Sequence, residues 1–152
     1  MPECLVATNR RHLSCAPEDV FAVLANGWLY PTWVVGASRM RDVEHAWPSA
    51  GAKIHHSFGV WPALIDDTTS ILEWDPPRHA KLKARGWPMG SAHVVLDVVA
   101  EPAGCLVTIT EDAVEGPGTL VPKPARDVMI KLRNRETLQR LAYLAEGRAD
   151  GK

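Results

Sequence analysis

The spacing of apolar and polar residues changes twice along this chain of 152 residues. A short helical pattern near the start gives way to strand-like alternation over about 38–113, and a long helical pattern then covers 125–146. Apolar residues at every second position indicate strands, and spacing of three and four indicates an amphipathic helix. We therefore predict one antiparallel sheet followed by one long helix, around which the sheet can curl to bury its apolar face.

The short helix is expected to begin near Pro17 and to end at Asn26 and Gly27. A proline followed by two acidic residues suits the first turn of a helix, where the helix dipole is positive. Asn and Gly tolerate the left-handed conformation that often ends a helix. The aromatic segment 28–33 is too short for a second long helix, so we predict a single turn or a packed loop there.

Alternation is cleanest in segments 79–87, 92–100 and 105–113, and a turn over 101–104 joins the last two into a hairpin. One row of each strand is mostly apolar and the other mostly polar, as in a sheet with one face against the core. The expected inward rows are Ala80, Leu82, Ala84 and Gly86; Ala92, Val94, Leu96, Val98 and Ala100; and Cys105, Val107, Ile109, Glu111 and Ala113.

Segment 53–61 follows the same rule, and its apolar row contains Ile54, His56, Phe58 and Val60. We therefore expect His56 to point inward. Segments 38–46 and 67–74 are also strand-like, but their alternation does not assign an inner face.

The closing helix carries two apolar stripes. A short stripe occupies its first turns, and a longer stripe runs its whole length at three- and four-residue spacing. The longer stripe is predicted to face the sheet, which places Asn134 inside, and a few polar residues over 147–152 are expected to fray. The short stripe is Ala125, Val128, Met129 and Leu132, and the long one is Ile130, Asn134, Leu138, Leu141 and Ala145.

Composition narrows the function without naming it. The length and a hydrophobic content of 46% fit a single domain over 1–152 with its own core. A net charge of −1 provides no broad positive field, so nucleic acid is not expected as a partner. The start lacks a signal-peptide core and no apolar run is long enough for a membrane span, so a cytoplasmic location is expected. The oligomeric state is left open.

The cysteines and histidines do not predict a metal centre. Cys4, Cys15 and Cys105 are odd in number and widely spaced, which argues against a disulfide framework and against zinc. His55 and His56 are neighbours on a strand, so they point to opposite faces and cannot hold one ion together. We expect no metal and no cofactor.

Four loose motifs together resemble a known family. They are Ala16-Pro17-Glu18-Asp19-Val20-Phe21, Tyr30-Pro31-Thr32-Trp33-Val34, Glu73-Trp74-Asp75-Pro76-Pro77 and Arg133-Asn134-Arg135-Glu136-Thr137-Leu138. The chain resembles the SRPBCC or START-like superfamily and, within it, the polyketide cyclase/dehydrase and lipid-transport group.

The resemblance implies an α+β helix-grip fold, with about seven antiparallel strands curled around a long C-terminal helix and two short helices closing one end. Its members include carriers of lipids and hormones, and aromatase/cyclases that act on polyketide chains. No catalytic motif is common to the fold, so the resemblance assigns no catalytic residue.

The sharpest candidate site combines Glu111 and His56 with Asn134, three polar residues on otherwise apolar inward rows. Such groups can orient a ligand or transfer a proton in a cavity that is poor in water. The alternative is that they satisfy one another or a bound water. The acids Asp66 and Asp67 are expected between strands, in a turn, with a structural role.

Aromatic residues are candidates for the walls or rim of a pocket, with the packing of sheet ends as the alternative. Trp87 shares its row with basic residues, which favours packing at that position. The predicted ligand contacts are Asn134, Tyr30, Trp33, Phe58, Trp61, Leu82, Ala84, Val94, Leu96, Ile109, Ile130 and Leu138.

Three functions remain open at this point. The first is a binding protein for a hydrophobic small molecule such as a lipid, a polyketide or an aromatic metabolite. The second is a polyketide aromatase/cyclase or dehydratase in which Glu111 or His56 transfers protons. The third is a protein-interaction module of the chaperone-regulator type, which requires an exposed apolar patch.

Overall fold

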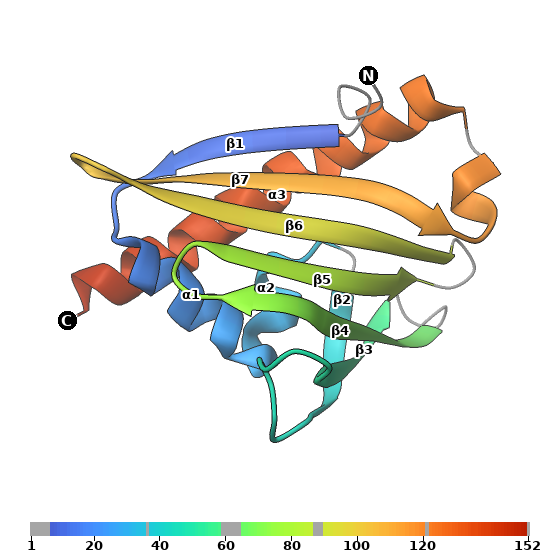
Figure 1. The fold of residues 1–152 in the computed structure, drawn as a ribbon, viewed down its shortest axis with the longest axis horizontal. Helices are drawn as coiled ribbons and strands as arrows, with labels where there is room; N and C mark the ends of the chain where they lie inside the picture. Colours follow the sequence, from blue (N-terminus) through green and yellow to red (C-terminus); the bar gives the residue numbers. More distant parts are fainter. Residues whose placement is uncertain (1–6, 36, 59–64, 87–89, 121, 152) are drawn as a thin grey trace.

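The computed structural model of the protein describes residues 7–35, 37–58, 65–86, 90–120 and 122–151. It contains one antiparallel sheet and one long helix, with short helices between the first two strands (Figure 1). The strands are β1 Ala7–Leu13, β2 Ala37–Val43, β3 Lys53–Phe58, β4 Ile65–Asp75, β5 His79–Gly86, β6 Gly90–Glu101 and β7 Gly104–Glu115. The helices are α1 Pro17–Ala25, η2 Gly27–Leu29, α2 Tyr30–Trp33, η3 Pro117–Leu120 and α3 Lys123–Asp150.

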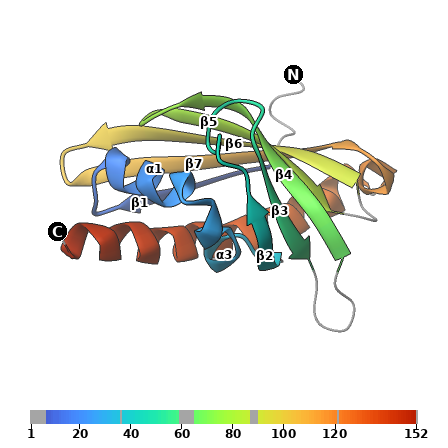
Figure 2. The ribbon, with the colours of Figure 1, turned by 90° about the horizontal axis from the view of Figure 1, so that it is seen from below.

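The seven strands follow the order β1-β7-β6-β5-β4-β3-β2, and every neighbouring pair is antiparallel. Figure 2 shows the sheet and α3 as two layers, with α1 beside the helix. This is the α+β helix-grip architecture that the sequence predicts, and the core lies between the two layers.

β1 was not predicted from alternation. Ala7 and Leu13 at its ends are buried, but the polar residues between them are only partly buried or exposed. The strand therefore has no apolar row to detect. It lies at the edge of the sheet and pairs with β7, where Leu13 is opposite Cys105.

The short helix and the following turns agree with the prediction. α1 begins at Pro17, and the buried Asp19 carboxylate accepts a hydrogen bond from the Ala16 amide at 3.3 Å. Segment 28–33 forms the last residues of η2 and the single turn of α2. This turn buries Tyr30 and Trp33 against the rest of the fold.

α3 buries the longer of its two predicted stripes, Ile130, Asn134, Leu138, Leu141 and Ala145. It also continues to Asp150, beyond the predicted end at Glu146. The reason is anchoring by its last turns. The Glu146 carboxylate accepts hydrogen bonds from the amide and hydroxyl of Ser14 at 2.9 and 3.1 Å, and Arg148 lies 3.5 Å from the Asp19 carboxylate.

Candidate functional site

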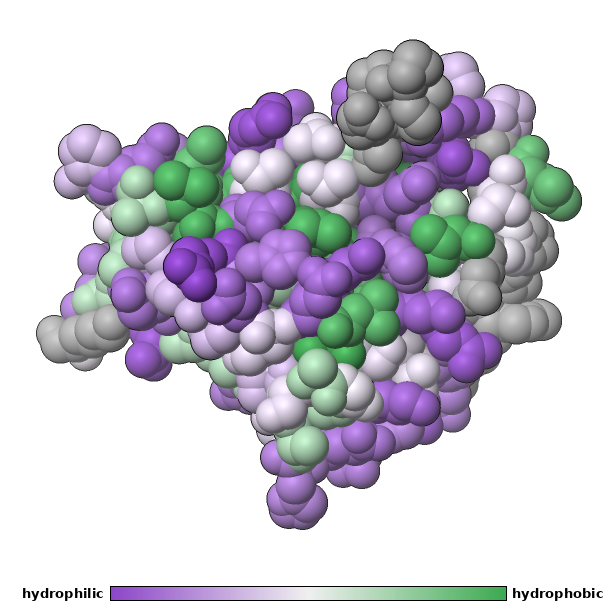
Figure 3. Space-filling view, viewed as in Figure 1, coloured by the Kyte–Doolittle hydropathy of each residue, from purple (hydrophilic) through white to green (hydrophobic). Residues whose placement is uncertain are grey.

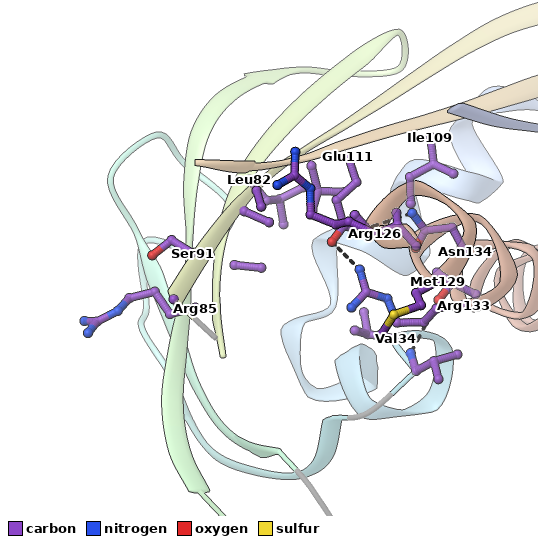
Figure 4. Close-up of a pocket in the computed structure, with 18 of the residues that line it drawn as sticks. Val34, Leu82, Arg85, Ser91, Ile109, Glu111, Arg126, Met129, Arg133 and Asn134 are labelled. Carbon is purple, nitrogen blue, oxygen red and sulfur yellow. Dashed lines mark hydrogen bonds and ion pairs between the residues drawn. The ribbon is translucent and has the colours of Figure 1, made fainter. Parts of the chain in front are cut away.

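A cavity of about 550 Å³ lies between the sheet and the first half of α3. Its walls come from the inner face of β5, β6 and β7, from the α2 turn and from α3 (Figure 4). Most of the lining is apolar, as ligand cavities usually are.

A row of alanines creates space on the sheet side of this cavity. Ala84 on β5 pairs with Ala92 on β6, and Ala92 pairs with Ala113 on β7. All three line the cavity. Methyl side chains in adjacent strands cannot reach α3, so a gap is left between the layers. The sequence predicted small residues on these inward rows, and the strand register brings them side by side.

The cavity ends where the inward rows become larger. Leu96 on β6 lies beside Ile109 on β7, and Leu96 is completely buried. The second half of α3 fills the same end with Leu138, Leu141 and Ala142, which belong to the packed core. α3 thus faces a cavity along its first half and a filled core along its second half.

The structure brings together many of the predicted ligand contacts. The cavity lining includes Tyr30, Trp33, Leu82, Ala84, Val94, Ile109, Ile130 and Asn134. Leu96 and Leu138 are instead buried in the core, because the large side chains of that end pack against one another. The side chain of Phe58, and the residues Trp61 and Trp87, lie outside the described part of the structure.

Glu111 is the acidic residue in the lining, and it is almost completely buried. One carboxylate oxygen accepts a hydrogen bond from Asn134 Nδ2 at 3.1 Å, and the other forms an ion pair with Arg133 (Figure 4). The inward positions of Glu111 and Asn134 agree with the sequence analysis. Because both carboxylate oxygens of Glu111 already face donors of α3, this arrangement suits the recognition of a polar ligand group.

Sequence analysis missed Arg133 and Arg126, which also line the cavity. The signal was present in their spacing, because the two residues are seven positions apart and share the side of α3 that carries Ile130. The predicted inner stripe did not contain them, because arginine side chains on a helix usually face solvent.

His56 points inward as predicted and is fully buried, but it is not among the residues that line the cavity. Its Nε2 lies 2.8 Å from Thr69 Oγ1, and the same oxygen lies 2.8 Å from the Tyr30 hydroxyl. The imidazole also stacks on the Tyr30 ring, with centroids 5.0 Å apart and planes at 14°. His56 is therefore linked to the cavity through Thr69 and Tyr30.

Burial keeps this hydrogen-bonded chain uncharged. Burial lowers the pKa of His56 to about 4 and raises the pKa of Tyr30 to about 12. Both groups are consequently neutral at physiological pH. The phenol of Tyr30, the hydroxyl of Thr69 and the neutral imidazole of His56 form a hydrogen-bonded series. Each member of this series can act as donor or as acceptor, so the direction of its hydrogen bonds can reverse.

Trp33 stands beside Tyr30 in the cavity wall, with an edge-on ring contact at a centroid distance of 5.5 Å. Its indole nitrogen is buried and has no hydrogen-bond partner among the described residues. A buried donor of this kind is costly to leave unsatisfied, and such groups are often explained by function.

The acids Asp66 and Asp67 lie inside β4, so their predicted place in a turn was wrong. The strand begins at Ile65 and pairs with β3, which sets Asp66 opposite Ser57 and Asp67 opposite His56. Asp66 accepts a hydrogen bond from Ser57 Oγ at 2.8 Å, and Asp67 lies 3.6 Å from Arg85. Their role in these contacts is structural.

Two kinds of feature are absent from the described ranges, a membrane-spanning helix and a cluster of metal ligands. None of the helices there is long and apolar enough to cross a membrane. In the part of the chain that the structure describes, no group of three or more His, Cys, Asp or Glu side chains is arranged to hold a metal ion.

A curled antiparallel sheet that encloses a cavity against a long helix defines a START-like, helix-grip domain. The chain matches the family model described as polyketide cyclase / dehydrase and lipid transport over residues 5–146. It therefore belongs to this family. No curated protein sequence is significantly similar to it.

Solved structures share the fold at low sequence identity. Protein NE0264 from Nitrosomonas europaea superposes with a TM-score of 0.74 and 15% identity, covering 97% of this chain and 98% of that one. StfQ, a di-domain ARO/CYC from the steffimycin biosynthetic pathway, gives a TM-score of 0.73 and 12% identity over 96% of this chain and 52% of StfQ. The chain thus spans about half of that di-domain protein.

Proposed function

We propose that this protein binds a hydrophobic small molecule, such as a lipid, a polyketide or an aromatic metabolite, in the cavity between the sheet and α3. The observation that carries the proposal is the row of three alanines on adjacent strands, which keeps space open where a packed core would otherwise form. The volume of about 550 Å³ lies within the range of roughly 300–1,000 Å³ typical of small-molecule sites.

The polar groups of the cavity suggest that the ligand is amphipathic. Glu111, Arg133 and Asn134 form one charged and hydrogen-bonding cluster in an otherwise apolar wall. A ligand with one polar group can exchange hydrogen bonds with this cluster while its apolar body contacts the alanine row. Such a division fixes the orientation of the ligand in the cavity.

The proposal can be tested with the neutral apolar fluorophore N-phenyl-1-naphthylamine. We expect the fluorophore to bind the protein, and we expect Ala84→Trp or Ala92→Trp to weaken binding by about tenfold because the indole fills the cavity. Ala100→Trp is the matched control, because Ala100 is exposed on the same strand as Ala92. Equal binding by all variants, with unchanged unfolding midpoints, would contradict the proposal.

The natural ligand can be sought directly by native mass spectrometry of freshly purified protein, followed by organic extraction. A defined mass adduct that is absent from Ala92→Trp would identify a cavity ligand. An adduct retained by this variant would place the bound molecule elsewhere on the protein.

A second candidate function is a polyketide aromatase/cyclase or dehydratase. The observation that favours it is the buried chain Tyr30–Thr69–His56, which ends at the cavity wall. In this function Tyr30, and not His56, would exchange a proton with a ligand oxygen, while Glu111 and Arg133 would orient the ligand. On a verified polyketide substrate, Tyr30→Phe should lower kcat more than it raises KM. Glu111→Gln should raise KM more than it lowers kcat.

A further inference from the structure

The first half of α3 and the preceding η3 expose large apolar side chains to solvent. They are Leu120, Val128, Met129 and Leu132, with 83, 58, 65 and 64% of their surface exposed. Val128, Met129 and Leu132 belong to the short apolar stripe of the sequence analysis. Val128, Met129 and Leu132 are called the α3 apolar stripe below.

The stripe occupies the side of α3 that faces away from the core. Residues three and four positions apart share one side of a helix, and Val128 and Leu132 are four apart. The core side is marked by Ile130 and Asn134, which are buried. α3 is therefore apolar on two opposite sides along its first half, and only one of them is covered.

Basic residues lie along both edges of the stripe. Segment 123–135 contains five basic residues and one acidic residue, whereas the whole chain contains 17 and 18. Lys131 and Arg135 are exposed, and neither has a carboxylate partner among the described residues. Arg126 and Arg133 lie on the edge next to the cavity, where Arg126 is 3.8 Å from Asp112 and Arg133 pairs with Glu111. Lys131 and Arg135 on the other edge therefore supply the uncompensated positive charge beside the exposed apolar side chains.

We propose that the α3 apolar stripe docks on a lipid bilayer that contains anionic phospholipids. Val128, Met129 and Leu132 would enter the headgroup region, and Lys131 and Arg135 would contact the anionic headgroups. An exposed apolar helix face with basic edges is the pattern by which amphipathic helices bind membrane surfaces.

The stripe is continuous with the cavity. Met129 is 65% exposed and also lines the cavity, so one residue belongs to both surfaces. A hydrophobic ligand that left the bilayer at this place would have a short path into the cavity. Docking itself does not require a bound ligand, so the two proposals can fail separately.

The composition of the stripe favours a bilayer over a protein partner. Its apolar members are aliphatic and contain no Trp or Tyr, the residues that dominate the binding energy of protein interfaces. On the face of the molecule formed by the sheet, apolar patches are by contrast interrupted by hydrophilic surface (Figure 3).

The test is co-sedimentation with vesicles, either of phosphatidylcholine alone or of phosphatidylcholine mixed with phosphatidylglycerol. We expect binding to the anionic vesicles, weaker binding to the neutral ones, and a decrease with added salt. Val128→Glu and Leu132→Glu should each weaken binding by about tenfold or more. Lys131→Glu combined with Arg135→Glu should weaken it by at least about tenfold.

Val99→Glu is the matched control, because Val99 is 60% exposed and lies on β6, away from α3. It should bind like the unmodified protein.

The proposal is overturned if folded protein does not bind anionic vesicles, if Val99→Glu loses as much binding as Leu132→Glu, or if added salt does not change the binding. It is also overturned if Leu132→Glu only converts a dimer into a monomer, because the stripe would then be a subunit interface. Titration with N-phenyl-1-naphthylamine in solution separates each of these results from loss of the cavity.

Discussion

Arg133 on α3 and Glu111 on β7 form an ion pair that joins the helix to the sheet across the cavity wall. The two partners differ in environment, because 40% of the Arg133 side chain is exposed and only 8% of the Glu111 side chain. The exposed partner can be hydrated when it is left alone, whereas the buried carboxylate cannot. The two halves of this pair should therefore respond differently to mutation.

Removal of Arg133 should cost more stability than neutralisation of Glu111. Arg133→Met leaves a buried carboxylate with one hydrogen bond from Asn134 and should lower the free energy of unfolding by about 3 kcal/mol. Glu111→Gln leaves a guanidinium that can turn toward solvent and should cost about 1 kcal/mol. Urea unfolding at neutral pH measures both. In the double variant the costs should not add, and additive costs would mean that the pair does not interact in solution.

Stability should fall as the pH is lowered, because His56 is buried in its neutral form. Its pKa is about 4 in the folded protein and near 6.5 in the unfolded chain, so the unfolded chain binds more protons between these values. The free energy of unfolding should therefore decrease by about 2 kcal/mol between pH 7 and pH 5. His56→Gln should remove most of this slope, and an unchanged slope would assign it to other groups.

The pKa of His79 is shifted upward, opposite to the shift of His56. Its Nδ1 lies 2.7 Å from Asp97 and its Nε2 lies 2.7 Å from Glu73, and the hydrogen bonds to these carboxylates raise the pKa of His79, with that to Asp97 the larger cause. The stabilisation that these hydrogen bonds provide is fully present below the pKa that His79 has in the unfolded chain. It is lost as the pH rises through the pKa that His79 has in the folded protein. In an NMR titration, the His79 midpoint should lie above that of a free histidine, and Asp97→Asn should lower it. A His79 midpoint unaffected by Asp97→Asn would show that the carboxylate is not in contact.

The sequence pattern predicted most of the fold, because the period of two in strands and the spacing of three and four in helices both follow from backbone geometry. Inward rows of period two placed Glu111 correctly, and the long helical stripe placed Asn134. β1 escaped detection because it is an edge strand that is buried only at Ala7 and Leu13.

The sequence predicted which side chains point inward, but it did not predict where the cavity ends. The rows of β6 and α3 continue inward through Leu96 and Leu138, but the point at which the cavity gives way to core depends on how closely the layers approach. The separation of His56 from the cavity depends on Thr69 and Tyr30, which come from other elements. Neither relationship is encoded in the spacing of one segment.

Two glycines should respond in opposite ways to the same substitution. Gly104 begins β7 with φ of +147°, and a Cβ atom there would lie 1.9 Å from the Leu13 carbonyl oxygen, which is backbone and cannot turn aside. Gly104→Ala should therefore separate β1 from β7 and destabilise the protein by about 3 kcal/mol or more. A Cβ atom at Gly147 in α3 would meet no atom within 4 Å, and this position has helical backbone. Gly147→Ala should stabilise the protein by about 0.5–1 kcal/mol, because alanine loses less backbone entropy than glycine in a helix. Thermal unfolding of the two variants checks both signs, and a stabilised Gly104→Ala protein would show that β1 does not pack against the start of β7.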